Sequence, residues 1–220
     1  MREPVSWKWL GLCAYEDALA HQEAAWTARR RGGRDVCFAL EHPPTITLGR
    51  RGTAADVVAS DDELAARGVG RHAIERGGHA TYHAPGQLVL YPIVHLAERG
   101  FGVRTFVWCL EEIMLGICDA VGVRATRDAR GHGVWTARGK LGAIGIRVRD
   151  GVSTHGLALN VDLDLAGYDL IAPCGVRGLP VTSLRAEGTD IDMQTLVPIA
   201  KAACRRMFDS AIGAEVEAHP

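Results

Sequence analysis

Two long strand-like segments joined by a tight turn place the strongest constraint on the fold of this chain. KLGAIGIRVR (140–149) and VSTHGLALNV (152–161) flank Asp150-Gly151, a dipeptide typical of hairpin turns. GHGVWTARG (131–139) precedes them and ends in an Arg-Gly turn. Strands joined by short turns pair with their neighbours in antiparallel fashion. We therefore expect the second half of the chain to build a largely antiparallel sheet.

Helical patterns surround this predicted sheet. Further elements are expected as helices at 15–31, 60–68, 103–122 and within 192–211, and as short strands at 35–42 and 45–50. Ser60 and Glu63 have the spacing of a capping box, and glycines follow three of the four helices. Pro198 obscures the start of the last helix. With no linker or repeat, residues 1–220 are predicted to form one α/β (α+β) domain, a mixed and mostly antiparallel sheet flanked by helices.

The composition excludes several classes of protein. The chain has 220 residues, of which 47% are hydrophobic and 23% charged. This length is enough for a sizeable core. A net charge of −1 gives no indication of nucleic-acid binding. No apolar run approaches the roughly 18 residues of a membrane span. The N-terminal residues resemble neither a signal peptide nor a transit helix, so a soluble, cytoplasmic protein is expected.

One of the six cysteines differs from the others in its surroundings. The cysteines stand at 13, 37, 109, 118, 174 and 204 with no Cys-x-x-Cys pair, so neither a disulfide framework nor a zinc site is expected. Cys37, Cys109, Cys118 and Cys204 lie in apolar patterns and are expected to pack as small hydrophobic residues. Cys174 lies between Pro173 and Gly175, a turn that can hold a thiol out of the core.

A glycine-rich stretch, RGGHATYHAPGQLVLYPIV (76–94), precedes an apolar strand. Its glycines would let the backbone approach a ligand closely, and the polar side chains beside them could orient it. A hairpin that needs glycine for its turn explains the same glycines equally well. His79 and His83 have the spacing of a helical metal-binding pair, but the glycines and prolines argue against a helix, and no metal site is predicted.

Lys140 is conspicuous because lysine is rare in this chain. Lysine and arginine together number 25, and only Lys8, Lys140 and Lys201 are lysines. Arginine supplies permanent charge, whereas lysine can also release a proton, so Lys140 could hold a titrating amine beside a reacting centre. A solvated lysine at the end of a strand is the simpler alternative. Gly139-Lys140 is not a phosphate loop, because the motif's first glycine is missing and Leu141 replaces its Ser/Thr.

Cys174 and Lys140 together suit acyl transfer. A free thiol has a pKa of about 8.5, and a nearby ammonium stabilises its thiolate. The same amine can pass a proton to a leaving group and accept one from an incoming nucleophile. If the two residues meet in space, the sequence predicts a Cys/Lys dyad that carries an acyl group as a thioester.

Five motifs resemble those of one enzyme family in order and spacing, namely EHPPTITLGRR (41–51), RGGHATYHAPGQLVLYPI (76–93), KLGAIGIRV (140–148), THGLALNVDLDL (154–165) and PCGVRGLPVTSL (173–184). The chain is similar to the octanoyltransferases of lipoate biosynthesis, the lipoyl(octanoyl) transferase family, over nearly its whole length. Ala84 stands where that family usually has glycine. The departure is expected to tighten the loop around the acyl pocket.

The resemblance implies a biotin/lipoyl protein ligase-like catalytic domain. The protein is expected to be a monomer, to need no cofactor or metal, and to bind neither nucleic acid nor membrane. It implies octanoyl-acyl carrier protein as donor and lipoyl domains as acceptors, in the E2 subunits of 2-oxoacid dehydrogenases and the glycine cleavage H protein. Cys174 matches the family's acyl-thioester nucleophile, and Lys140 matches the lysine that activates it. The substrate-binding positions fall on Arg76, Gly77, Gly78, His79, Ala80, Thr81, Tyr82, His83, Ala143, Ile144, Gly145, Gly156, Leu157 and Ala158.

Three alternatives stay open at this point. An ATP-dependent lipoate or biotin ligase shares the fold but needs no nucleophilic cysteine, so Cys174 with Lys140 argues against it. An amidotransferase that moves lipoyl or octanoyl groups between protein domains would use the same thioester. A non-catalytic carrier-binding module would need neither residue.

Arginine pairs are the candidates for partner recognition. Acyl carrier proteins and lipoyl domains are expected, by the resemblance, to be acidic, while this chain is nearly neutral. We predict that Arg50-Arg51, Arg127 with Arg130, and Arg147 with Arg149 bind them. The alternative for each pair is ordinary solvated surface charge.

Overall fold

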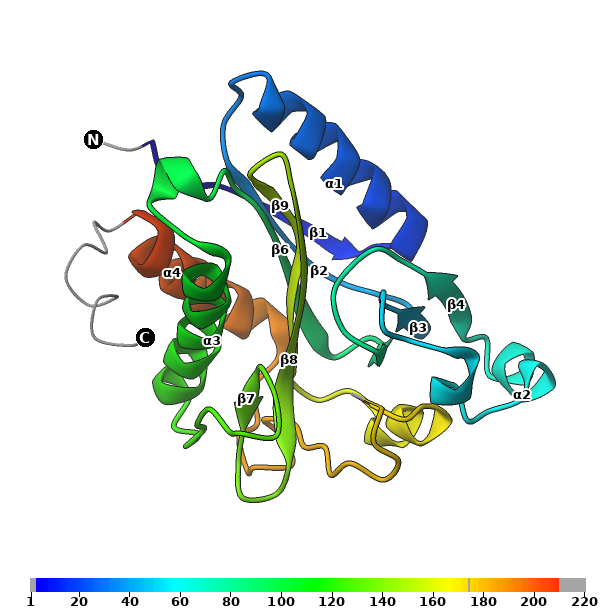
Figure 1. Cartoon of the computed structure of the whole chain (residues 1–220). Coiled ribbons are helices and arrows are strands. Elements are labelled where there is room, and N and C mark those ends of the chain that lie inside the picture. The colour runs from blue at the N-terminus through cyan, green and yellow to red at the C-terminus, as the bar shows by residue number, and fades with distance from the viewer. Residues whose placement is uncertain (1–2, 174, 210–220) are drawn as a thin grey trace.

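The computed structural model describes residues 3–173 and 175–209, whose strands form two sheets (Figure 1). The larger sheet has the order β1-β2-β6-β9-β8-β7 and the smaller one the order β4-β3-β5. The strands are β1 (Ser6–Leu12), β2 (Val36–Glu41), β3 (Thr45–Leu48), β4 (Gly70–Ala73), β5 (Ala80–His83), β6 (Gln87–Ile93), β7 (Val134–Trp135), β8 (Lys140–Arg149) and β9 (Val152–Asn160).

The predicted hairpin is the centre of the larger sheet. β8 and β9 pair antiparallel from Gly142 opposite Leu159 to Arg149 opposite Val152. Asp150 and Gly151 both have positive φ, 51° and 76°, as a two-residue turn of the I′ type requires. β9 lies between β6 and β8, and all nine of its residues are buried. The mixed, mostly antiparallel arrangement expected from the sequence is therefore confirmed.

Helices cover both faces of the larger sheet. α1 (Tyr15–Arg30) lies on one face, and α3 (Val103–Ala120) and α4 (Met193–Asp209) pack together on the other (Figure 1). The short α2 (Asp61–Ala66) begins where the Ser60 hydroxyl accepts a hydrogen bond from the Glu63 N–H, as the capping pattern predicts. Three 3₁₀ turns complete the chain, η1 (Ala54–Asp56), η2 (Ala97–Arg99) and η3 (Leu165–Leu170).

The strands differ from the sequence-based expectation in two respects. They form two sheets, and β1 and β4 were not predicted, because each is an edge strand whose sequence shows no sustained alternation of apolar and polar residues. β1 also pairs parallel with β2. The last helix lies within the predicted range 192–211: α4 starts at Met193, where the Asp192 carboxylate accepts a hydrogen bond from the Thr195 N–H, and it continues through Pro198. The predicted packing of Cys37, Cys109, Cys118 and Cys204 is confirmed, since all four are at most 3% exposed.

Three backbone links connect the two sheets and the segment 173–184. The Gly77 N–H donates to the Ile146 carbonyl, 2.9 Å away, and ties the glycine-rich loop to β8. Ala80 forms a bridge with Pro173, and Lys140 forms one with Val181. Segments that carry separate sequence motifs thereby come to surround one space. Within the described ranges, no helix combines the length and apolar character needed to cross a bilayer.

A buried cluster of charges clamps the end of the larger sheet and gives a stability prediction. Asp35 is 7% exposed, and its carboxylate accepts hydrogen bonds from Arg29, from Arg99 at 2.6 Å and from the His95 N–H. We expect Asp35→Ala to lower the free energy of unfolding by about 3 kcal/mol, because two buried guanidinium groups lose a shared counter-charge, while Arg29 keeps its pair with Glu98 and Arg99 its pair with Asp209. Urea unfolding followed by circular dichroism measures this change.

Arg34→Ala is the matched control. Arg34 pairs with Glu3 at 2.9 Å, but both side chains are more than half exposed. Exposed pairs contribute about 0–1 kcal/mol, so this variant should unfold almost as the parent does. Equal effects of the two substitutions would contradict the assignment of Asp35 as the buried clamp.

Candidate active site

A cavity of about 520 Å³ lies where the two sheets meet. The glycine-rich loop and β5 form one wall, β8 forms a second, and the loop at 130–132 forms a third. Pro173 and Val181 close it from the segment that follows β9. Ten of the predicted site residues line this cavity, namely Arg76, Gly77, Gly78, His79, Ala80, Thr81, Lys140, Ala143, Ile144 and Gly145.

Lys140 lies on the wall of this cavity and is only 7% exposed. Its backbone N–H donates to the Pro180 carbonyl at 2.8 Å, and its carbonyl accepts from the Thr182 N–H at 2.9 Å. Its Nζ lies 5.0 Å from the centre of the Trp135 ring. The alternative of a solvated strand-end lysine is therefore wrong: burial at a cavity wall requires that the ammonium be held by specific contacts.

Cys174 itself lies outside the described residues, but both of its chain neighbours are described. Pro173 lines the cavity and bridges Ala80. Gly175 has a φ of +75°, and a side chain at that position would come within 3.3 Å of the His79 ring. The residues on either side of Cys174 are thus next to residues of the cavity wall.

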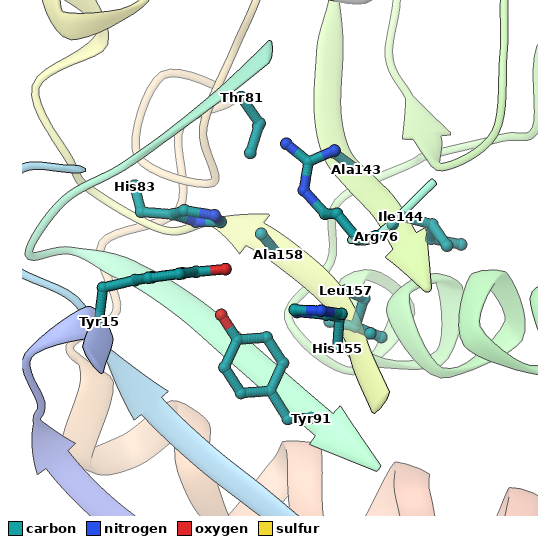
Figure 2. Close-up of a pocket in the computed structure, with 12 residues that line it drawn as sticks. Tyr15, Arg76, Thr81, His83, Tyr91, Ala143, Ile144, His155, Leu157 and Ala158 are labelled. Atoms are coloured by element: carbon teal, nitrogen blue, oxygen red, sulfur yellow. The ribbon is translucent and has the colours of Figure 1, made fainter. Parts of the chain in front are cut away.

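A smaller chamber of about 40 Å³ adjoins this cavity, between the larger sheet and Tyr15 at the start of α1. Figure 2 shows its lining, with the hydroxyls of Tyr15 and Tyr91 pointing toward each other across the space. The remaining predicted residues that reach a cavity are found here, namely His83, Gly156, Leu157 and Ala158. The two spaces are neighbours, because both are lined by Arg76, Thr81 and the segment 143–145.

Several polar side chains line the chamber among apolar ones, but they carry little charge. Burial lowers the pKa of His155 to about 3, and it lowers the pKa of His83 well below its ordinary value. Burial likewise raises the pKa of Tyr91 well above 10. These rings are neutral at physiological pH. The charged group at its wall is Arg76, whose guanidinium donates to the Thr47 carbonyl at 2.8 Å and so fastens the glycine-rich loop to β3.

Tyr82 and Ala84 lie away from the two cavities. Side chains alternate along a strand, so Tyr82 faces away from Thr81 and packs against the Tyr168 ring, with centroids 5.7 Å apart. Tyr82 lines neither space. Ala84 is 4% exposed inside an apolar cluster with Ile46 and Leu163. Ala84 therefore forms no part of the wall of either cavity.

Several site residues were missed in the sequence. His79 Nδ1 lies 3.2 Å from the Asp56 carboxylate, and His83 Nδ1 lies 2.7 Å from Gln87 Oε1, so each histidine has its own protein partner. Asn160 accepts a hydrogen bond from Gln87 and donates one to the Thr182 carbonyl. Polar residues at the ends of otherwise apolar strands could have indicated this part of the site: Gln87 begins β6, and Asn160 ends β9. Asp56 had none, because it comes from a short 3₁₀ turn.

Comparison with known proteins identifies the family. The model of the lipoyl protein ligase A/B catalytic domain matches residues 14–205. An octanoyltransferase of Desulfotalea psychrophila is 47% identical over 188 residues, which cover 83% of this chain and 84% of that protein. The chain belongs to the octanoyltransferase family. The mitochondrial octanoyltransferase of Arabidopsis thaliana is 41% identical over 203 residues, with 90% of this chain and 84% of that protein covered.

Solved structures bear out the fold expected for this family. The bi-partite lipoate protein ligase of Thermoplasma acidophilum superposes with a TM-score of 0.71, covering 93% of this chain and 84% of that one. Its sequence identity is only 13%, so the likeness concerns the fold alone. The predicted ligase-like catalytic domain, with mixed sheets flanked by helices, is confirmed.

Proposed function

We propose that this member of the octanoyltransferase family moves an octanoyl group from octanoyl-acyl carrier protein to a lysine of lipoyl domains, through a thioester on Cys174. The observation that carries the proposal is the buried lysine. Lys140 lies on the wall of the cavity that the chain neighbours of Cys174 border. The octanoyltransferase relatives, at 41% and 47% identity over most of the chain, support the same reaction.

In the first half-reaction, Lys140 takes the proton of the Cys174 thiol. The thiolate attacks the thioester carbonyl of the donor, a C–S bond to Cys174 forms, and the C–S bond to the carrier breaks. The Lys140 ammonium returns its proton to the departing carrier thiolate. The products are octanoyl-Cys174 and the free carrier thiol.

In the second half-reaction, the neutral amine of the acceptor lysine attacks octanoyl-Cys174. A C–N bond forms, the C–S bond breaks, and Lys140 passes the proton lost by the amine to the Cys174 thiolate. The conversion of a thioester to an amide is downhill, so ATP is not needed.

The lining of the two cavities suits an alkyl chain. Small residues of β8 and β9, such as Ala143, Gly145 and Ala158, leave room beside the sheet. The volume of about 520 Å³ lies within the range of small-molecule sites. We propose that Arg76 to Thr81 and His83 form one side of the acyl site and that residues 143–145 and 156–158 form the other. Tyr82 supports the loop from behind.

The direct test is intact mass spectrometry. Incubation with octanoyl-acyl carrier protein alone, without ATP, should add the mass of one octanoyl group to the chain, and addition of a lipoyl domain should remove it. A ligase would acquire no adduct from this donor and would need ATP and the free acid. Donor specificity is tested in parallel with an octanoylated lipoyl domain, because an amidotransferase would be loaded by that donor.

Of the three arginine pairs predicted to bind partners, Arg50-Arg51 is the one that the fold leaves available. Arg127, Arg130, Arg147 and Arg149 each lie within 4 Å of an acidic side chain of the chain itself. Within the described part of the molecule, Arg50 and Arg51 form no ion pair, both are exposed, and Arg51 lines the larger cavity. We propose that they contact the acidic partner at the cavity mouth.

The Arg50→Glu/Arg51→Glu variant should therefore lower kcat/KM for octanoyl-carrier protein by about tenfold at low salt, because opposite charges raise the association rate. For the parent protein, kcat/KM should also fall as salt rises to physiological strength. Transfer from a small octanoyl thioester should stay nearly unchanged in both cases. The Arg30→Glu variant is the control, because Arg30 is exposed and pairs with Asp150 away from the cavity. If kcat/KM is independent of salt and of the Arg50/Arg51 reversal, the two arginines do not bind the carrier.

A further inference from the structure

Trp135 is a fully buried aromatic residue beside the proposed catalytic lysine. It is 1% exposed and stands directly opposite Lys140 in the antiparallel pair of β7 and β8. The Lys140 Nζ lies 5.0 Å from the centre of the indole ring. This distance is within the range in which an ammonium is attracted to an aromatic face, about 6 Å.

An irregularity in the strand pairing accompanies this contact. Trp135 pairs with Lys140, but Val134 pairs with Gly142, so β8 has one extra residue between the two pairs. A bulge of this kind turns a side chain out of the regular alternation, and bulges are frequent next to active sites. Leu141, the extra residue, is fully buried in the apolar core. The bulge therefore places Trp135 opposite Lys140, at the cavity wall, where a regular register would place it opposite Leu141.

Other contacts hold the indole ring in place. Its Nε1 donates a hydrogen bond to the Gly131 carbonyl at 3.0 Å, and its backbone forms two 2.8 Å hydrogen bonds with Thr126. A second cation, Arg130, lies with Cζ 4.2 Å from the ring centre and is bound by Asp128. Arg130 and Gly131 also line the larger cavity. The ring therefore joins the loop at 126–133 to the lysine.

We propose that Trp135 is a positioning residue for Lys140: the face of its indole ring stabilises the ammonium and fixes it at the cavity wall. The proposal rests on the proposed function, in which this ammonium is the partner of the Cys174 thiolate. Lys140 as a residue is 7% exposed, so its side chain has lost much of its hydration, and an aromatic face replaces part of it without accepting the proton. The amine can therefore still transfer its proton to sulfur.

The alternative is that Trp135 only fills space, and fluorine substitution separates the two. Site-specific incorporation of mono-, di- and trifluorotryptophan at position 135 weakens the negative ring face stepwise with little change in shape. We expect the rate of Cys174 alkylation by iodoacetamide at pH 7 to fall stepwise, by about tenfold for the trifluoro ring, because destabilising the ammonium lowers the fraction of thiolate–ammonium pair. The basic limb of the pH profile of octanoyl transfer should move to lower pH.

Trp26 is the matched control. It is also buried, its Nε1 also donates to a backbone carbonyl, and two cations, Arg30 and Arg149, lie over its ring. It does not line the larger cavity. The same fluorine series at position 26 should leave the alkylation rate and the pH profile unchanged.

Two outcomes overturn the proposal: an alkylation rate that is flat across the series at position 135, or the same decline at position 26. Thermal unfolding of each protein shows whether fluorine has disturbed packing. The alkylation assay contains no acyl donor, so its result is independent of octanoyl transfer. Failure of the parent protein to acquire an octanoyl adduct would instead count against the proposed function.

Discussion

The Cys174→Ala variant is expected to lose both the octanoyl adduct and all measurable transfer. Without the thiol, no acyl-enzyme can form, and the enzyme does not catalyse a direct attack of the acceptor lysine on the carrier thioester. The remaining thiols are poor substitutes. Burial raises the pKa of Cys109 and of Cys118 to about 12, and it raises the pKa of Cys204 well above its ordinary value. Intact mass and a transfer assay measure the two losses.

Cys109→Ala is the control for this prediction. Cys109 is fully buried on α3 within the apolar core, so its replacement should leave both the adduct and the turnover intact while lowering stability slightly. A Cys174→Ala protein that retains full turnover would end the thioester hypothesis. A Cys109→Ala protein that loses its adduct would place the nucleophile elsewhere.

The central part of the fold could be predicted because its determinants are local. The apolar alternation of β8 and β9 and the Asp150-Gly151 turn specify a hairpin without reference to the rest of the chain. The helical period and the stop at Gly122 do the same for α3. Elements that depend on tertiary contacts could not be predicted from the sequence. β1, with a half-exposed and irregular pattern, is a strand only because β2 offers it a parallel edge.

The site could be predicted in part for a related reason. The glycine-rich loop, Lys140 and the cysteine turn were each recognisable as unusual residues in their own segments. That the first two meet around one cavity depends on the link of Gly77 to Ile146, and Pro173, the neighbour of Cys174, reaches the cavity through its link to Ala80. Neither link has a sequence pattern of its own.

Trp135 shows the limit of reading residues singly. An aromatic residue in a short apolar strand predicts packing, and Trp135 is indeed buried. Its contact with Lys140 follows from the strand register and the bulge, which the sequence does not specify. The orientation of the Tyr82 side chain could not be predicted from the motif either. The motif is a continuous run of residues, whereas side chains along β5 alternate between two faces, and Tyr82 packs against Tyr168.

Lys140→Arg is expected to fail as a replacement although it keeps the positive charge. A guanidinium at position 140 could still favour the Cys174 thiolate, but it cannot release a proton near neutral pH, and both half-reactions need a group that gains and loses one. It is also larger and planar, in a position that is 7% exposed and packed beside the Trp135 ring. We expect kcat to fall by about 10²- to 10⁴-fold, the usual contribution of general acid–base catalysis.

Two measurements on this variant separate charge from proton transfer. Thiol alkylation against pH reports how far the arginine still stabilises the thiolate, and steady-state octanoyl transfer reports the complete cycle. If Lys140 acts as acid and base, alkylation should persist while transfer is lost. Lys201→Arg, a lysine-to-arginine change on α4 away from the cavity, should affect neither. Near-normal transfer by the Lys140→Arg protein would show that Lys140 supplies only charge, and the proton would then have to travel by another group.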